Sequence, residues 1–305
     1  MRIIVITPTR NEERYIGTAL ACMTRQTLLP VKWIIVNDGS IDSTKEIVEN
    51  FAKRNDFIEL ITLNDRGFRM PGQGVIEAFY SGFNLICNLE YDVVAKLDAD
   101  LDFPPDTLEV ISKAFATNRR LGITGGTLYD RVINNSRENL SKNLVPRGFV
   151  GGPAKFYRKQ CFIDIGGPIT RAGWDGVDTI YAKMKGWETG ELESLKLIHC
   201  RPMGTAAGEG LRKAYIKYGD VSYYMGGYIW YFFLRVLGRS IQGKSLSSGY
   251  YMLHGYLRAL LNKTQRESCE FRKFLKKQQI KNMKYWFSLL FKKINQKSNR
   301  IFADD

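Results

Sequence analysis

The chain has 305 residues, of which 44% are hydrophobic, and its formal net charge at pH 7 is +14. That length and hydrophobic content are enough to bury a full core, with one large domain and an annex. The positive charge points to a nucleic acid, an anionic membrane surface or a phosphorylated substrate as partner. Between residues 263 and 300, twelve Lys and Arg residues stand against two Glu residues, so the basic character belongs to the C-terminal part.

The cysteines and the first residues indicate the compartment. The five cysteines are scattered, their number is odd, and there is no Cys-x-x-Cys pair. This pattern excludes a disulfide framework and a zinc site, and is typical of reduced thiols. The apolar run in residues 1–8 is too short for a signal peptide, and no small-residue cleavage site follows it. We therefore expect a cytoplasmic protein.

Strands and helices are predicted to alternate along the first half of the chain. Apolar runs predict strands at residues 3–7, 33–36, 58–63, 91–97 and 122–128. Helical spacing predicts helices at 18–23, 75–89 and 106–118, and Ser43 to Glu46 fits a capping box before another. Alternation of this kind predicts an α/β fold with a mostly parallel, Rossmann-like sheet and helices on both faces.

The pattern changes twice further along the chain. From about Asn134 it is irregular and glycine-rich, and then predicts a helix at 177–185 and a strand at 195–198. After about residue 208 the chain is aromatic and basic, which predicts a mainly helical annex over 209–305. The uncharged run 221–234 is too short to span a membrane and predicts a buried or interfacial helix. Residues 271–291 fit an amphipathic surface helix, and packing on the core and membrane contact both stay open for the annex.

The stretch from Val93 to Asp100 is the most informative in the sequence. An apolar strand ends there in Asp98-Ala99-Asp100. In open α/β sheets ligands bind at the carboxyl ends of strands, and carboxylates two residues apart point the same way. Such a pair can hold one hard cation together with substrate phosphates. The alternative is an acidic turn that starts the next helix, with Asp106 or Thr107 as its cap.

With these residues the chain resembles the family 2 glycosyltransferases of the GT-A fold. Four segments match in the family's order and cover about residues 1–200: Thr7-Pro8-Thr9-Arg10-Asn11-Glu12-Glu13, Val36-Asn37-Asp38-Gly39-Ser40-Ile41-Asp42-Ser43-Thr44, Asp98-Ala99-Asp100, and Asp175 eleven residues before Gly186-Trp187. The resemblance implies a GT-A domain over 1–208. Its nucleotide-sugar-binding half would be 1–130, and its acceptor and catalytic half 131–208.

The resemblance also implies a role for each matching side chain. Pro8, Thr9 and Glu12 would line the nucleotide cleft, and Asp38 would accept a hydrogen bond from the base. Asp98 would contact the ribose, or the metal through water, and Asp100 would bind Mg²⁺ or Mn²⁺ bridging the diphosphate. Asp175 would be the general base. A UDP-sugar is the first choice of donor because Asp38 suits the uracil N3–H, with GDP and dTDP donors left open.

Three positions depart from the family or carry an alternative. The family often has Glu before the base, where this chain has Trp174, although Asp178 follows one helical turn on. For the family's basic residue near Pro71-Gly72 we prefer Arg69 over Arg66 as a phosphate ligand, and a turn with solvated charges stays open. Asp175 could instead be only a helix N-cap.

His199 ends a predicted strand. In several GT-A enzymes a histidine at this stage of the chain completes the metal site, and imidazole is a common metal ligand. The alternative is a packed histidine at a strand end.

These observations predict an inverting, metal-dependent transferase that moves a sugar to a hydroxyl of a saccharide or lipid-linked saccharide. It would build a cell-envelope polysaccharide or glycolipid in the cytoplasm, with peripheral contact to the inner face of the plasma membrane as an option. A nucleotidyltransferase is disfavoured because residues 7–13 lack glycine. A nucleic-acid-binding protein gives no reason for the four aspartates, so no nucleic acid partner is expected. A sugar-nucleotide-binding protein without activity stays open.

Overall fold

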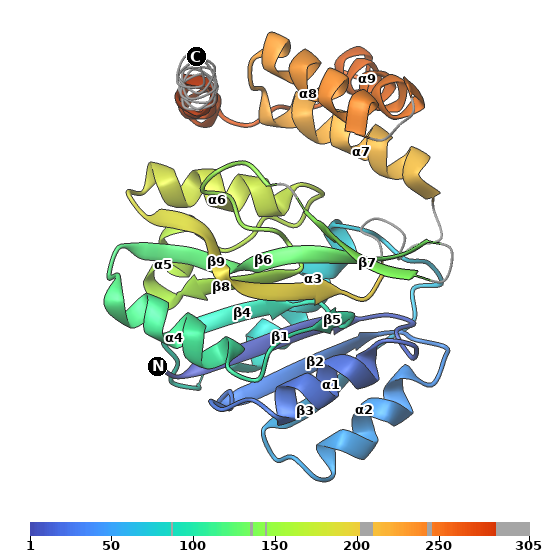
Figure 1. The fold of residues 1–305 in the computed structure, drawn as a ribbon, viewed down its shortest axis with the longest axis vertical. Coiled ribbons are helices and arrows are strands. Elements are labelled where there is room, and N and C mark those ends of the chain that lie inside the picture. Colours follow the sequence, from blue (N-terminus) through green and yellow to red (C-terminus); the bar gives the residue numbers. More distant parts are fainter. Residues whose placement is uncertain (87, 135–136, 144, 202–209, 243–245, 285–305) are drawn as a thin grey trace, which may run out of the picture. The chain divides into compact units, whose positions relative to one another are not determined.

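The computed structural model describes residues 1–86, 88–134, 137–143, 145–201, 210–242 and 246–284 (Figure 1). The chain divides into two compact units, an N-terminal unit Met1–Leu211 and a C-terminal unit Arg212–Asp305. The sequence analysis placed this division at residue 208.

The N-terminal unit is built on one sheet with the order β3-β2-β1-β4-β8-β6-β9-β5. Its first four strands are parallel: β1 (Ile3–Thr9), β2 (Lys32–Asp38), β3 (Ile58–Leu63) and β4 (Val93–Leu97). The rest is mixed: β5 (Leu101–Asp102), β6 (Leu121–Asn134), β7 (Arg137–Lys142), β8 (Ala154–Arg158) and β9 (Glu188–His199). β8 runs antiparallel to both its neighbours, while β6 and β9 are parallel. The predicted mostly parallel α/β sheet is confirmed.

Helices cover both faces of this sheet, as predicted. Successive strand residues point to opposite faces, so Ile3 and Val5 enter one core cluster while Ile4 and Ile6 enter the other. The first cluster is closed by α1 (Ile16–Thr24), α2 (Thr44–Ala52) and α4 (Thr107–Thr117). The second is closed by α3 (Gln73–Phe83), α5 (Lys159–Ile165) and α6 (Trp174–Met184). A single 3₁₀ turn, Asn84–Ile86, follows α3.

Two local predictions in this unit are wrong. The region after residue 134 is not irregular throughout, because it contains β7, β8 and α5. β8 escaped the sequence analysis because a lysine interrupts its apolar run. The expected capping box is also absent: the Ser43 side chain makes no capping hydrogen bond, and Asp42 Oδ1 accepts from the Thr44 N–H at 3.0 Å instead.

The described part of the C-terminal unit is helical. It contains α7 (Gly210–Met225, which starts two residues before the unit boundary), α8 (Ile229–Gln242) and α9 (Leu246–Leu261), and residues 269–284 are helical as well. The predicted helix over 221–234 is wrong, because the chain turns at Gly226, which has a φ of 65°. A Cβ there would lie 2.3 Å from Arg272 Cδ. Of the predicted helix 271–291, residues 285–291 lie outside the described residues.

Candidate active site

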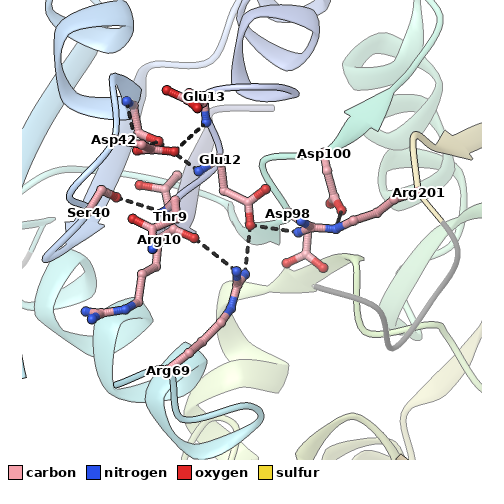
Figure 2. Close-up of polar contacts among 12 residues, drawn as sticks. Thr9, Arg10, Glu12, Glu13, Ser40, Asp42, Arg69, Asp98, Asp100 and Arg201 are labelled. Carbon is pink, nitrogen blue, oxygen red and sulfur yellow. Dashed lines mark hydrogen bonds and ion pairs between the residues drawn. The ribbon is translucent and has the colours of Figure 1, made fainter. Parts of the chain in front are cut away.

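The loops that follow β1 and β2 are tied together at the carboxyl ends of the strands (Figure 2). Asn11 N donates to Ser40 Oγ at 3.0 Å, and Ile41 N donates to Asn11 Oδ1 at 3.0 Å. Gly39 has a φ of 69°, and a Cβ there would lie 2.5 Å from Asp65 Cα. Only glycine fits that turn without displacing the neighbouring loop. Pro8 and Thr9, which were expected to line the nucleotide cleft, therefore end β1 at the rim that these two linked loops form.

Asp38 ends β2 on this rim and is 7% exposed. Arg66 Nη2 donates to Asp38 Oδ1 at 2.7 Å, while Arg10 donates to the Asp38 backbone carbonyl. Arg66 also binds Glu77 at 2.7 Å. One carboxylate oxygen of Asp38 is thus held by a cation, which orients the side chain.

A second group of acids and bases lies where β4 and β9 end. His199 Nε2 lies 3.2 Å from Asp100 Oδ2, and His199 Nδ1 lies 3.4 Å from Asp130 Oδ1. The pairing of β5 with β9 places Leu101 opposite His199 and so brings the histidine to the acidic motif. Asp98, Asp100 and His199 each offer a ligand atom, and these atoms lie within 4.8 Å of one another.

Two arginines connect this group to the β1 loop (Figure 2). Arg201 Nε lies 2.7 Å from Asp100 Oδ2, and Arg201 Nη2 lies 2.7 Å from Glu12 Oε1. Arg69 Nη2 lies 2.7 Å from the same Glu12 oxygen. The Glu12 side chain is only 3% exposed, so its charge is balanced inside the protein. Acids and cations therefore alternate through the centre of the site.

The pKa values follow from this mixture of burial and pairing. Burial raises the pKa of Glu12, and Arg201 only partly opposes it. Burial also acts to raise the pKa of Asp100, but the contacts with His199 and Arg201 outweigh it and lower that pKa. Burial acts to lower the pKa of His199, but Asp100 and Asp130 outweigh it and raise the pKa to about 10. His199 is therefore an imidazolium paired with two carboxylates at neutral pH.

The residues of this centre fit a divalent cation. Glu12 Oε2 is buried with no hydrogen-bond partner among the described residues, and Asp100 Oδ2 and His199 Nδ1, also buried, meet their charged neighbours at ion-pair distance without hydrogen-bonding geometry. Carboxylates suit Mg²⁺ and Mn²⁺, and an imidazole adds affinity for a transition ion. Metal binding would require His199 to give up its proton, because a metal ligand must be deprotonated.

The expected base Asp175 lies in the first turn of α6. The residue before the helix is Gly173, with a φ of 84°, so the alternative of Asp175 as the N-cap is wrong. A Cβ at Gly152 would lie 3.3 Å from Asp175 Oδ2, which places the carboxylate against the segment before β8. Asp178 is 2% exposed and accepts from Tyr157 at 2.5 Å, so it offers no second carboxylate to a substrate.

The structure adds residues that the sequence analysis did not predict. Arg201 and Asp130 meet the acidic motif only through the pairing of β6 with β9, and no sequence pattern links them. Lys96 and Lys155 carried a usable signal, since each is a charge among the apolar residues of its strand. A buried lysine needs a partner for its charge. Lys96 donates to Asp98 and Lys155 donates to the backbone carbonyl of Asp175, and both of these aspartates are candidate site residues.

The family can be assigned once this geometry is known. Residues 4–171 match the family model described as Glycosyl transferase family 2. The chain belongs to this family.

Curated relatives are similar over part of their length. Glycosyltransferase GlyA of Streptococcus pneumoniae is 25% identical over 197 residues, which are 57% of this chain and 27% of the relative. The uncharacterized glycosyltransferase alr2836 of Nostoc sp. is 32% identical over 124 residues, which are 40% of this chain and 35% of the relative. The chain thus spans about a quarter to a third of the length of these relatives.

Solved structures of low identity share the GT-A fold. S. aureus TarS 1–349 in complex with UDP-GlcNAc has a TM-score of 0.52 at 19% identity, covering 73% of this chain and 66% of that one. The mannosyltransferase PcManGT from Pyrobaculum calidifontis, in complex with GDP-Man and Mn²⁺, has a TM-score of 0.53 at 15% identity. The aligned part covers 90% of this chain and 78% of the PcManGT chain. At such identities these neighbours establish the fold alone.

Glu191 on β9 is a half-buried carboxylate in this unit. Its Oε1 has no hydrogen-bond partner among the described residues. Burial raises the pKa of Glu191 to about 7, although a backbone hydrogen bond from Gly151 opposes the shift. The folded protein therefore holds a proton that the unfolded chain releases near pH 4.5.

This proton sets a pH dependence. Because the folded-state pKa is raised, the wild type loses stability as pH rises from about 4.5 to 7. We expect Glu191→Gln to be more stable than the wild type at pH 8 by about 1–2 kcal/mol, after allowing for solvent screening, with a smaller difference at pH 5. Urea unfolding at both pH values measures this. Glu193→Gln, an exposed neighbour on the same strand, is the control, and equal effects of the two variants would contradict the assignment.

Proposed function

We propose that this chain transfers a sugar from a nucleotide-sugar donor to a hydroxyl of a saccharide or lipid-linked acceptor, with inversion at the anomeric carbon. The observation that carries the proposal is the convergence of Asp98, Asp100 and His199 within 4.8 Å at one end of the sheet. Membership of a family of glycosyltransferases supports it. A binding protein without activity would not need a general base, the role proposed for Asp175 in the first turn of α6.

The residues have distinct tasks in this reaction. Asp98, Asp100 and His199 would hold Mn²⁺ or Mg²⁺, which when bound neutralises charge on the leaving diphosphate. Arg69 would add positive charge on the β1 side of the cleft. Asp175 would take the proton from the acceptor hydroxyl as that oxygen attacks the anomeric carbon. One base and one direct displacement give inversion.

The base of the donor is proposed to be uracil. One oxygen of Asp38 is held by Arg66, which leaves the other to accept a hydrogen bond from an N3–H. Structures of similar fold are described in complex with UDP-GlcNAc in one case and GDP-Man in another, so fold alone does not decide the base.

Calorimetric titration of UDP, GDP and dTDP with Mn²⁺ tests the proposal. We expect UDP to bind only when Mn²⁺ is present, and Asp100→Asn to weaken this binding at least tenfold because the cation loses a charged ligand. Asp175→Asn should bind UDP as the wild type does. It should release sugar from the matching nucleotide sugar about a hundredfold more slowly.

Asp56→Asn is the matched control for these two variants, since Asp56 is an exposed acid between α2 and β3. It should leave both binding and sugar release unchanged. If no nucleotide binds, or if Asp100→Asn binds UDP as tightly as the wild type, the proposed donor site is wrong.

We also propose that the C-terminal unit contacts an anionic membrane surface. Residues 212–305 contain 19 Lys and Arg against five Asp and Glu, whereas residues 1–211 contain 26 of each, so the whole net charge of +14 falls in this unit. Juxtamembrane basic residues are attracted to anionic lipid. None of the described helices is both long and apolar enough to cross a bilayer. The acceptor could then be a lipid-linked saccharide at the inner face of the membrane.

One face of α8 supports this contact. Exposed apolar side chains recur along one side of the helix: Ile229 (55% exposed), Trp230 (37%), Phe233 (45%), Leu234 (54%) and Leu237 (59%). At the start of this face Tyr228 stacks on Trp230 at 5.3 Å, and Lys276 Nζ lies 5.3 Å from the Tyr228 ring. An apolar face bordered by aromatic and basic side chains is typical of interfacial helices.

Cosedimentation with phosphatidylglycerol vesicles measures the contact. We expect the double variant Phe233→Asp, Leu237→Asp to bind at least tenfold more weakly, because it places two charges on the apolar face. Leu29→Asp, at a position 48% exposed in the N-terminal unit, is the control. Equal binding of the double variant, or a preference for a DNA oligonucleotide over the vesicles, would contradict the proposal.

A further inference from the structure

Two lysines are buried opposite one another in the middle of the sheet. Lys96 on β4 and Lys155 on β8 are register partners across the antiparallel pair. They are 2% and 0% exposed. Lysine is almost never buried to this degree unless its charge is paired. Two like charges in adjacent buried positions therefore need a structural reason.

Each lysine ends on a different part of the active site. Lys96 Nζ donates to Asp98 of the acidic motif, and at 3.0 Å to the Gly152 carbonyl. Lys155 Nζ donates to the backbone carbonyl of Asp175 at 2.5 Å. Lys155 Nζ also donates to Asp178, so the first turn of α6 is held by two hydrogen bonds from Lys155 on β8.

The indole of Trp174 contacts both ammonium groups. Lys96 Nζ lies 5.3 Å from the ring centroid, and Lys155 Nζ lies 5.5 Å from it. Trp174 is 5% exposed, so these contacts are desolvated. Cations are attracted to the face of an indole, most strongly when water is excluded.

We propose that Lys96, Trp174 and Lys155 act as one positioning unit that holds the donor-side carboxylate Asp98 and the base Asp175 in a fixed relation. This inference rests on the proposed sugar transfer and assigns it three positioning residues. The unit connects the two halves of the site through side chains that a substrate does not reach. This positioning unit also explains why a tryptophan can stand at position 174, where the family often has an acid.

An acid in place of Trp174 would act differently. A buried carboxylate between two lysines would accept their hydrogen bonds in competition with Asp98 and Asp178. An indole face attracts the same ammonium groups but accepts none of their N–H donors in this way. Tryptophan thus offsets the repulsion between the lysines while it leaves their hydrogen bonds directed at the site.

The test compares Trp174→Leu, which removes the aromatic face, with Trp174→Phe, which keeps one. Trp187→Leu is the packing control: Trp187 also lies in the N-terminal unit, but its indole N–H donates to Asp164 at 2.9 Å. Each variant is assayed for kcat and KM of sugar release from UDP-glucose and UDP-GlcNAc, for Kd of UDP with Mn²⁺, and for Tm.

We expect Trp174→Leu to lower kcat at least tenfold while KM and the UDP Kd stay within twofold of the wild type. Trp174→Phe should recover kcat to within threefold, and Trp187→Leu should lower Tm without lowering kcat by more than twofold. The proposal is overturned if Trp174→Leu lowers kcat no more than Trp187→Leu, or if Phe and Leu at position 174 behave alike. If the wild type releases sugar from no nucleotide sugar, the proposed function fails, and this inference fails with it.

Discussion

The burial of carboxylates at the carboxyl ends of β1 and β4 is the constraint on which the rest of the site depends. Glu12 is 3% exposed and Asp100 is 2% exposed. Isolated charges at such depth are costly, so the fold must bring cations to them. Arg69, His199 and Arg201 supply these charges, and they come from far along the chain. The long pairing of β9 with β6 is therefore needed for the charge balance of the site as well as for the sheet.

The two units differ in net charge, and this difference fits two separate tasks. The N-terminal unit has equal numbers of acidic and basic residues, and Asp38, Glu12 and Asp100 at the candidate site are each paired with an arginine. The C-terminal unit carries the whole excess of +14 and exposes an apolar face on α8. A neutral unit can exchange its internal ion pairs for those of a charged ligand, while a basic unit can hold the protein at an anionic surface.

Local features of the sequence predicted the part of the site that local features control. Asp98 and Asp100 were predictable because an apolar strand ends in them, and the loops after β1 and β2 because of their resemblance to the family. Arg201 and Asp130 were not, because their positions depend on strand register between segments more than 60 residues apart. The structure places His199 Nε2 3.2 Å from Asp100, and its role as a metal ligand stays a prediction beside that of a packed histidine.

The predictions that were wrong also failed because of contacts between residues far apart in the sequence. Residues 221–234 are uniformly apolar, but Gly226 ends α7 where Arg272 approaches the backbone, a contact that no window of sequence reveals. Asp178 looked like a spare carboxylate one turn after the base. It is instead a buried partner of Lys155 and Tyr157, and burial raises its pKa against the effect of both donors.

We propose that Glu12 and Asp100, the buried acids balanced by Arg201, are the same acids that bind a divalent cation. Titration of Mn²⁺ without nucleotide, followed by electron paramagnetic resonance, tests it with Arg201→Gln. Arg120→Gln is the charge-matched control, since Arg120 pairs with Glu188 at the surface with its side chain 74% exposed. The account predicts that Arg201→Gln binds Mn²⁺ about tenfold more tightly than the wild type, because a competing positive charge leaves Asp100. Unchanged or weaker binding, or an equal effect of Arg120→Gln, would contradict it.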